Sequence, residues 1–172
     1  MLADHEPPGV SVTVETTVVP PGDDNYVEPA WALKERIRRE EGVLKQRKGF
    51  FTSAFRRGKC HLILDCETDE LLAFSTTRDG GYMLFLAVRP EYRGCGFGRE
   101  LVSVIADEYG TVTCHARVSN ENALDFYDRL GFEIVRRIDR YYEDQGDAYY
   151  LRLGQPRSMT SRLFDLIGRE SS

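Results

Sequence analysis

The sequence predicts a single α/β domain in which a mostly antiparallel sheet is flanked by helices. Strand-like and helix-like segments alternate along the chain, and two pairs of neighbouring strand-like segments are typical of hairpins. A chain of 172 residues with 41% hydrophobic residues fits one domain with one sizeable core. We expect the domain to span residues 11–153, with a disordered tail over residues 1–10 and an extension over residues 154–172.

Composition argues against several classes of function. The formal net charge of -5 offers no basic surface for nucleic acid. No apolar run approaches the ~18 residues of a membrane-spanning helix, and the N-terminus lacks the pattern of a secretory signal. The four cysteines form no CxxC pair and have no histidine at metal-ligand spacing, so we expect reduced core thiols and no metal site. These features together predict a cytoplasmic protein without nucleic-acid or membrane partners.

The first half of the chain contains strand, helix and hairpin patterns. β-branched residues alternate over residues 11–19, and Pro29 suits the first position of a helix. Residues 43–58 are ambiguous, because apolar residues at helical spacing lie among basic ones; an amphipathic helix with an aromatic core face is the favoured interpretation. Residues 61–66 and 71–77 flank a polar turn and predict a hairpin.

The second half continues the alternation. Residues 82–88 are apolar without alternation, which is typical of a strand covered on both faces. Residues 111–118 alternate, so His115 and Arg117 point away from the face that carries Cys114. The remaining predictions are a helix over residues 99–109, a helix over 121–130 capped by Ser119 or Asn120, and a final hairpin over 133–142 and 147–153.

A glycine-rich loop, RGCGFG over residues 93–98, follows the apolar strand. Its arginine, its backbone amides and the positive end of the next helix converge on one point, which predicts an anion site with a pyrophosphate as the expected ligand. The dinucleotide fingerprint is excluded because Arg99 and Leu101 stand where glycines are needed, and no Walker GKS or GKT follows. A plain strand-to-helix turn is the alternative interpretation.

Two motifs resemble those of the GNAT N-acetyltransferases. The loop is similar to the R/QxxGxG/A coenzyme A loop of that family, and SNENALDFYDRLGF is similar to its second signature. The resemblance covers about residues 60–153. It implies acetyl-CoA as cosubstrate and a mixed sheet of about seven strands, split between two central parallel strands at 82–88 and 111–118. It also implies coenzyme contacts from Leu86, Val88, Arg93, Gly94, Gly96, Phe97, Gly98, Arg99, Asn120 and Tyr127.

Within that family, the chain resembles protein N-terminal acetyltransferases of the Naa50 type and of the ribosomal-protein alanine acetyltransferase type. CHARVSNENALDFYDRLGFE, followed by RYYEDQGDAYYLRL, carries this resemblance. The Phe-Pro segment that shapes the peptide pocket in the Naa50 type has no counterpart in residues 38–55. The identity of the acceptor's first residue, and whether the acceptor is a protein, therefore stay open.

The resemblance assigns chemical roles to five residues. His115 falls on the position of the general base, and Tyr82 falls on a catalytic tyrosine that helps to position a water. Tyr127 would protonate the departing thiolate, and Tyr141 and Tyr142 would contact the substrate backbone. Four of the five have a purely structural alternative. His115 could be a sheet histidine whose hydrogen bonds are satisfied, and Tyr127 could be a core aromatic beside other rings. Tyr141 and Tyr142 could serve only cross-strand packing in an edge hairpin.

Proton affinity favours an N-terminal amine as acceptor. An α-amine with a pKa of about 7.8 lies roughly 1.3 units above a histidine base of about 6.5, whereas lysine lies about 3.9 units above it. At about 1.4 kcal/mol per unit, deprotonating lysine requires roughly 3.5 kcal/mol more. We expect direct transfer in a ternary complex, because Cys95 lies in the glycine loop and Cys114 faces the apolar side of its strand.

The sequence thus predicts an acetyl-CoA-dependent N-acetyltransferase whose acceptor is a protein N-terminus or another primary amine. One alternative is an enzyme that acetylates a small amine, which the acidic residues Glu143, Asp144 and Asp147 would attract. The other is a non-catalytic coenzyme A sensor. A homodimer is compatible with the sequence, which does not fix the oligomeric state.

Overall fold

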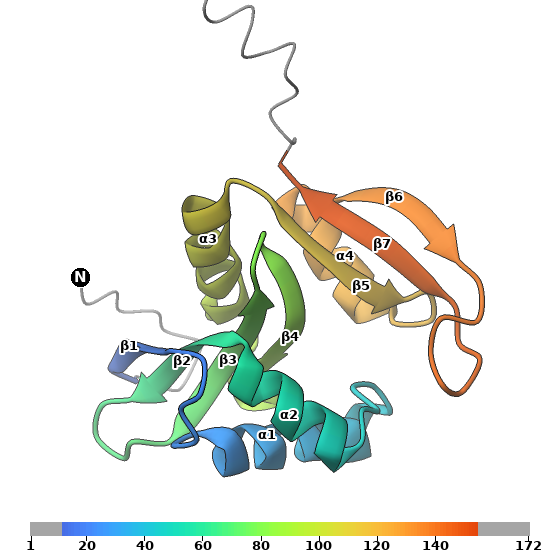
Figure 1. Cartoon of the computed structure of the whole chain (residues 1–172). Helices are drawn as coiled ribbons and strands as arrows, with labels where there is room; N and C mark the ends of the chain where they lie inside the picture. Colours follow the sequence, from blue (N-terminus) through green and yellow to red (C-terminus); the bar gives the residue numbers. More distant parts are fainter. Residues whose placement is uncertain (1–11, 155–172) are drawn as a thin grey trace, which may run out of the picture.

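The computed structural model describes residues 12–154, in which a seven-stranded sheet in the order β1-β2-β3-β4-β5-β7-β6 is flanked by helices (Figure 1). The predicted N-terminal tail and all but the first residue of the predicted extension lie outside these residues. The elements are β1 (Val14–Val19), α1 (Val27–Glu41), α2 (Lys48–Arg57), β2 (Lys59–Asp65), β3 (Leu71–Arg78), β4 (Tyr82–Val88), the 3-10 helix η1 (Pro90–Tyr92), α3 (Phe97–Tyr109), β5 (Val112–Arg117), α4 (Glu121–Leu130), β6 (Glu133–Ile138) and β7 (Ala148–Leu153).

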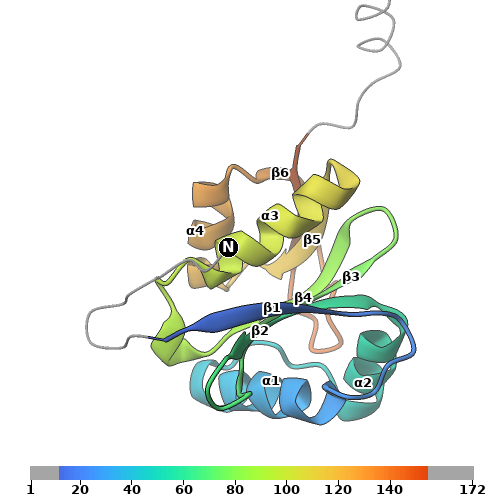
Figure 2. The same ribbon diagram turned by 90° about the vertical axis from the view of Figure 1, so that its left-hand side faces the viewer.

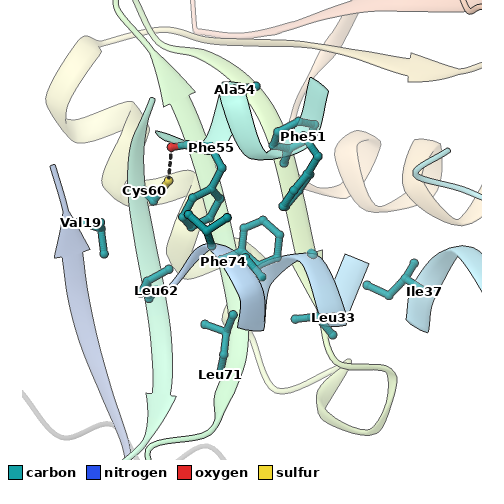
Figure 3. Close-up of a cluster of buried hydrophobic side chains, with 14 of the residues drawn as sticks. Val19, Leu33, Ile37, Phe51, Ala54, Phe55, Cys60, Leu62, Leu71 and Phe74 are labelled. Atoms are coloured by element: carbon teal, nitrogen blue, oxygen red, sulfur yellow. Dashed lines mark hydrogen bonds between the residues drawn. The ribbon is translucent and has the colours of Figure 1, made fainter. Parts of the chain in front are cut away.

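Helices cover the two faces of the sheet separately. Figure 2 shows α1 and α2 on one side and α3 and α4 on the other. The aromatic residues of α2 form the predicted core face, since Phe51 and Phe55 are buried against Phe74 of β3 (Figure 3). The amphipathic interpretation of this segment is therefore confirmed, although Phe50 is 52% exposed.

Helix α1 differs from its prediction in two details. It begins at Val27, so Pro29 lies within the first turn, where a helical N–H has no partner in any case. Lys34 is buried, although lysine usually stays in solvent, while Ala32 is exposed. The Lys34 ammonium donates to the backbone carbonyl of Gln46 and lies 4.5 Å from the ring centre of Trp31, and these contacts replace its lost hydration.

The sheet is split between its two parallel strands. All other neighbouring strands are antiparallel, whereas β4 and β5 pair only where Tyr82 lies opposite Thr113. Beyond that pair the two strands diverge, which confirms the predicted division of the sheet (Figure 1). The edges of β4 and β5 beyond Tyr82 and Thr113 consequently face a gap instead of each other.

Strand β4 has helices over both faces, as its unbroken apolar run predicts. Phe85 and Ala87 pack into the cluster with α1 and α2, while Leu86 and Val88 pack against the cluster with α3. Leu86 and Val88 nevertheless keep part of their surface exposed, because they border the gap beside β5.

The cysteines follow the predicted pattern with one exception. Cys60, Cys95 and Cys114 are buried free thiols, and Cys60 donates to the backbone oxygen of Phe55 (Figure 3). Cys66 was expected in the core but is exposed, because it begins the turn that follows β2. Its thiol therefore contributes nothing to the core.

Candidate active site

A groove of about 540 Å³ lies where β4 and β5 diverge. It runs from the glycine loop to the segments that follow α1 and β6, and its walls come from both halves of the sheet. Every residue predicted to contact the coenzyme borders this groove: Leu86, Val88, Arg93, Gly94, Gly96, Phe97, Gly98, Arg99, Asn120 and Tyr127. Of the other predicted site residues, His115 and Tyr142 border it, and Tyr82 and Tyr141 contact His115 from outside its lining.

The glycine loop presents backbone donors to one end of the groove. Gly94 and Gly96 have φ values of 84° and 85°, a left-handed conformation that glycine adopts without strain. Cys95 is an exception to the expected row of free amides, because its N–H bonds to the Tyr92 oxygen at 3.3 Å. Within residues 12–154, no hydrogen-bond acceptor is found for the N–H groups of Gly94, Gly96, Phe97, Gly98 and Arg99. Because α3 begins at Phe97, its positive end adds to these donors.

The third glycine of the loop has a packing role that the sequence did not reveal. A Cβ atom at Gly98 would lie 2.9 Å from the ring of Phe126, which projects from α4 onto the first turn of α3. Gly98 therefore allows α3 and α4 to approach each other while its own N–H stays available.

Arg93 is paired in the described structure. Its guanidinium binds the carboxylate of Glu41 at the end of α1, with Nη2 and Oε2 3.0 Å apart. Both side chains border the groove. Glu41 lies 52 residues before Arg93, so nothing local in the sequence indicated this pair. An anion that binds Arg93 has to compete with this carboxylate.

The open edge of β4 presents backbone N–H groups to the groove. The N–H of Arg89, directly after β4, bonds to the Leu72 oxygen of β3 at 2.8 Å. Because N–H groups alternate between the two edges of a strand, those of Leu86 and Val88 point to the opposite edge, where β5 has diverged. Two backbone donors are thus directed into the groove.

Tyr82 and His115 form a direct hydrogen bond between the first residue of β4 and the middle of β5. The Tyr82 hydroxyl lies 2.6 Å from Nδ1 of His115. Burial strongly raises the pKa of Tyr82, and burial together with the charge of Arg136 lowers the pKa of His115. We therefore assign a protonated Tyr82 as the donor and a neutral His115 as the acceptor, with the imidazole proton on Nε2.

Tyr127 belongs to the core and to the groove at once. It lies on α4 with its ring 5.3 Å from that of Phe126 and 5.0 Å from that of Phe132, and it is only 9% exposed. Burial beside Cys114 raises the pKa of Tyr127 well above its usual value, so the phenol stays protonated. The core interpretation is correct for its ring, and its position in the groove wall leaves a chemical role open to its hydroxyl.

The two thiols nearest the groove stay protonated as well. Burial raises the pKa of Cys114 to about 12, and it also raises the pKa of Cys95. Since the thiolate is the nucleophilic form of cysteine, neither side chain is prepared for an acyl-enzyme step.

Asn120 is a helix cap. Its Oδ1 accepts a hydrogen bond from the N–H of Ala123 at 3.2 Å at the start of α4, as predicted. The residue also borders the groove, so capping leaves its side-chain amide free to donate there.

Tyr141 and Tyr142 lie in the loop between β6 and β7, because β6 ends at Ile138. The prediction that extended the hairpin strand to residue 142 is therefore wrong, and cross-strand packing does not describe these two rings. Tyr141 stacks on His115 with ring centres 4.3 Å apart and planes inclined by 9°. Tyr142 borders the groove, and burial raises its pKa to about 12.

The comparison with curated proteins decides the family. The chain is 31% identical over 118 residues to N-alpha-acetyltransferase 30 of Saccharomyces cerevisiae. The aligned segment covers 65% of this chain and 67% of that protein. The family model for FR47-like proteins matches residues 62–142. The chain belongs to the GNAT family of N-acetyltransferases. This N-acetyltransferase spans only about half of two further relatives, N-alpha-acetyltransferase MAK3 of Arabidopsis thaliana (36% identity, 60% of this chain, 55% of that protein) and N-alpha-acetyltransferase 30 of Schizosaccharomyces pombe (36%, 40% and 49%).

Solved structures share the fold of this GNAT chain. The NatC complex bound to Gag peptide and CoA aligns with a TM-score of 0.64 and 19% identity, over 83% of this chain and 99% of that chain. The ribosomal-protein-S18-alanine N-acetyltransferase of Escherichia coli aligns with a TM-score of 0.63 and 22% identity, over 81% and 94%. NAA60 of Arabidopsis thaliana, solved in complex with acetyl-CoA, aligns with a TM-score of 0.63 and 20% identity, over 82% and 100%. Acetyl-CoA is the acetyl donor of the family, which confirms the expected cosubstrate.

Membrane-spanning helices and metal sites were not expected from the sequence. None of the helices within residues 12–154 is both long and apolar enough to cross a membrane. In the same range, no three His, Cys, Asp or Glu side chains are grouped so that they could hold a metal ion.

Several groove residues were not assigned from the sequence, and three of them are polar residues of the acceptor side or of the wall formed by α1. Glu41 and Gln46 reach it from α1 and the segment after it, and Arg117 reaches it from β5. The alternation of β5 did place Arg117 on the same face as His115, and that was the one available signal. The other two depend on how α1 crosses the sheet.

Proposed function

We propose that this GNAT enzyme acetylates the α-amine of a protein N-terminus by direct transfer from acetyl-CoA in a ternary complex. The observation that carries the proposal is the 2.6 Å hydrogen bond between Tyr82 and a neutral His115 beside the groove. A neutral imidazole is matched to an α-amine, whose pKa of about 7.8 lies close to its own usual range. The names of the curated relatives agree with this acceptor class.

The coenzyme would lie along the groove from the glycine loop towards β5. The free N–H groups of Gly94, Gly96 and Phe97 would bind its pyrophosphate at the start of α3. The N–H groups of Leu86 and Val88, at the open edge of β4, would bind pantetheine and hold the thioester oxygen as negative charge develops on it.

Protons would leave the acceptor through Tyr82. As the amine nitrogen bonds to the thioester carbon, the Tyr82 oxygen accepts a proton from it and passes its own proton to Nδ1 of His115. When the carbon–sulfur bond breaks, the hydroxyl of Tyr127 protonates the departing thiolate. Tyr127 and His115 then recover their starting states by proton exchange with solvent.

The ion pairs of the acceptor side argue against a small polyamine as substrate. Glu143, Asp144 and Asp147 do not form a free acidic cluster, because each is already paired with a basic side chain. Their partners are Arg47 for Glu143, Lys45 and Arg117 for Asp144, and Arg137 for Asp147. A cationic small molecule would have to displace these partners.

The test is to incubate the enzyme with acetyl-CoA and peptides that vary in their first residue and carry internal lysines, and to locate each added acetyl group by mass spectrometry. We expect α-amine acetylation that is reduced by about 10²-fold or more in Tyr127→Phe and in His115→Ala. Acetylation of lysines alone would contradict the proposed acceptor. Acetyl-CoA binding without any turnover, unaffected by these substitutions, would favour a sensor.

A further inference from the structure

The loop over residues 139–147 folds around the side chain of Arg117. The N–H of Tyr142 donates to the Gly146 oxygen at 3.1 Å, which closes a tight turn. Nη1 of Arg117 donates to both carboxylate oxygens of Asp144 at 2.9 and 3.1 Å. The Arg117 guanidinium also lies over the ring of Tyr142, 4.0 Å from its centre. The Arg117 side chain of β5 therefore contacts two members of this turn, the Asp144 carboxylate and the Tyr142 ring.

Gly146 makes this close fit possible. A Cβ atom at Gly146 would lie 2.5 Å from Nη1 of Arg117, which is far inside van der Waals contact. Arg117 is well covered by the turn, since only 14% of its side chain is exposed. A planar guanidinium can stack flat on a ring and bond to a carboxylate at the same time, whereas an ammonium group has no plane with which to stack.

The turn carries the two tyrosines that surround the predicted base. Tyr141 stacks on His115, and Tyr142 borders the groove. Arg117 follows His115 by two residues on β5, so both side chains lie on one face of the same strand. From the opposite wall, Lys45 reaches Asp144 with a 3.1 Å contact. The turn is thus held by Arg117 of β5 and, from the opposite wall of the groove, by Lys45.

We propose that Arg117 is a positioning residue that shapes the acceptor side of the groove. Through Tyr142, Asp144 and Gly146, it holds the turn that keeps Tyr141 against His115 and Tyr142 beside the path of the acceptor. This inference rests on the proposed function, because it concerns binding of the acceptor amine and its chain, and it leaves binding of acetyl-CoA untouched.

Steady-state kinetics on the full chain test the inference. Because small misplacements of positioning groups have large effects, we expect Arg117→Gln to raise the acceptor KM about tenfold or more and to change the acetyl-CoA KM by less than about twofold. Arg117→Lys keeps the positive charge but lacks the planar guanidinium group, so its acceptor KM should lie between those of the wild type and Arg117→Gln. Gly146→Ala should resemble Arg117→Gln, because the added methyl group displaces the guanidinium.

Arg137→Gln is the matched control. Arg137 pairs with Asp147 in the same hairpin at 2.6 Å, but it lies opposite Tyr149 and so projects from the other face of the sheet. Its loss should leave the acceptor KM within about twofold of the wild type, because only the groove-side turn is expected to position the acceptor. An unchanged acceptor KM in both Arg117→Gln and Gly146→Ala would overturn the inference, as would an equal rise in both KM values.

A second measurement needs no catalysis. The chain has 3 histidines, so the ring protons of His115 can be assigned by NMR with the help of His115→Gln. The stacked ring of Tyr141 should shift the His115 resonances upfield, and Arg117→Gln should return them towards ordinary values. If no peptide is acetylated by the wild type, the proposed function fails while this result still decides the role of Arg117: unchanged His115 shifts in Arg117→Gln would refute it.

Discussion

At the scale of single residues, the hydrogen bond between Tyr82 and His115 determines which imidazole nitrogen is available. Nδ1 is occupied by the phenol, so in the proposed mechanism a proton from the acceptor would reach it through the Tyr82 oxygen. Tyr82→Phe removes this route without removing the ring, and we expect kcat to fall about 10²-fold with little change in acetyl-CoA affinity. Steady-state kinetics and calorimetry check this, with Tyr26→Phe, at the N-cap of α1 and outside the groove lining, as the control. A kcat within a few-fold of the wild type would show that the proton takes another path.

The pH dependence of kcat follows from the same pair. His115 accepts a proton only when it is neutral, and burial lowers its pKa below the usual value of about 6.5. The neutral base therefore predominates at pH 7, and half of it is lost only at a pH below about 6.5. We expect the acidic limb of a kcat–pH profile to lie below that value. A limb that survives unchanged in His115→Gln would belong to another group.

At the scale of elements, the contact between α3 and α4 depends on Gly98. Gly98→Ala places a methyl group against the Phe126 ring, and such overpacking costs roughly 1–3 kcal/mol of unfolding free energy. Phe126→Leu in the same chain should recover part of the loss, since it removes the atoms that clash. Urea unfolding measures both effects. Equal losses in Gly98→Ala with and without Phe126→Leu would contradict this account of the third glycine.

The β2–β3 hairpin contains a buried histidine that imposes its own pH dependence. His61 lies opposite Ser75, and neither Nδ1 of His61 nor Oγ of Ser75 has a hydrogen-bond partner within residues 12–154. Burial, aided by the charge of Lys59 and opposed by that of Glu108, lowers the pKa of His61, so the folded state favours its neutral form. Its contribution to stability is complete above the unfolded pKa of about 6.5 and is lost as the pH falls below it.

Replacement of this histidine should make unfolding less sensitive to acid. Between pH 6.5 and 5.5, the wild type should lose up to about 1 kcal/mol more unfolding free energy than His61→Gln, which cannot take up a proton. Urea unfolding at both pH values measures the difference. Parallel pH profiles for the two proteins would mean that His61 is protonated equally in the folded and unfolded states.

At the scale of the whole molecule, the two halves of the sheet are joined by one pair of residues between β4 and β5. A coenzyme that lies along this gap contacts both halves, so its binding should stabilise the entire chain. At 100 times its Kd, acetyl-CoA should add about 2.7 kcal/mol to the unfolding free energy. Thermal unfolding with increasing acetyl-CoA measures this, and Arg93→Gln should need a higher concentration for the same rise in Tm. A Tm that does not depend on acetyl-CoA would contradict coenzyme binding in this groove.

Much of this architecture could be predicted from local patterns. The alternation of β5, the unbroken apolar run of β4 and the cap of α4 each depend on neighbours within a few residues, and the two GNAT motifs supplied the split sheet. Contacts between distant segments could not be predicted in this way. The Arg93–Glu41 pair depends on how α1 meets the glycine loop, and the Lys45–Asp144 pair depends on how the segment after α1 meets the β6–β7 loop. The buried Lys34 likewise follows from tertiary contacts that override its usual preference for solvent.

If the glycine loop binds the coenzyme as proposed, the pairing of Arg93 with Glu41 would also affect which anions bind there. A simple ion such as chloride or acetate that approaches Arg93 only replaces one negative partner with another and gains little. A diphosphate can displace the carboxylate and also engage the unoccupied amides of the loop, so its net gain is much larger. Glu41 would therefore favour selective binding. It neutralises Arg93 in the absence of the coenzyme, and only a ligand with several suitably placed charged oxygens would displace it with a net gain in binding free energy.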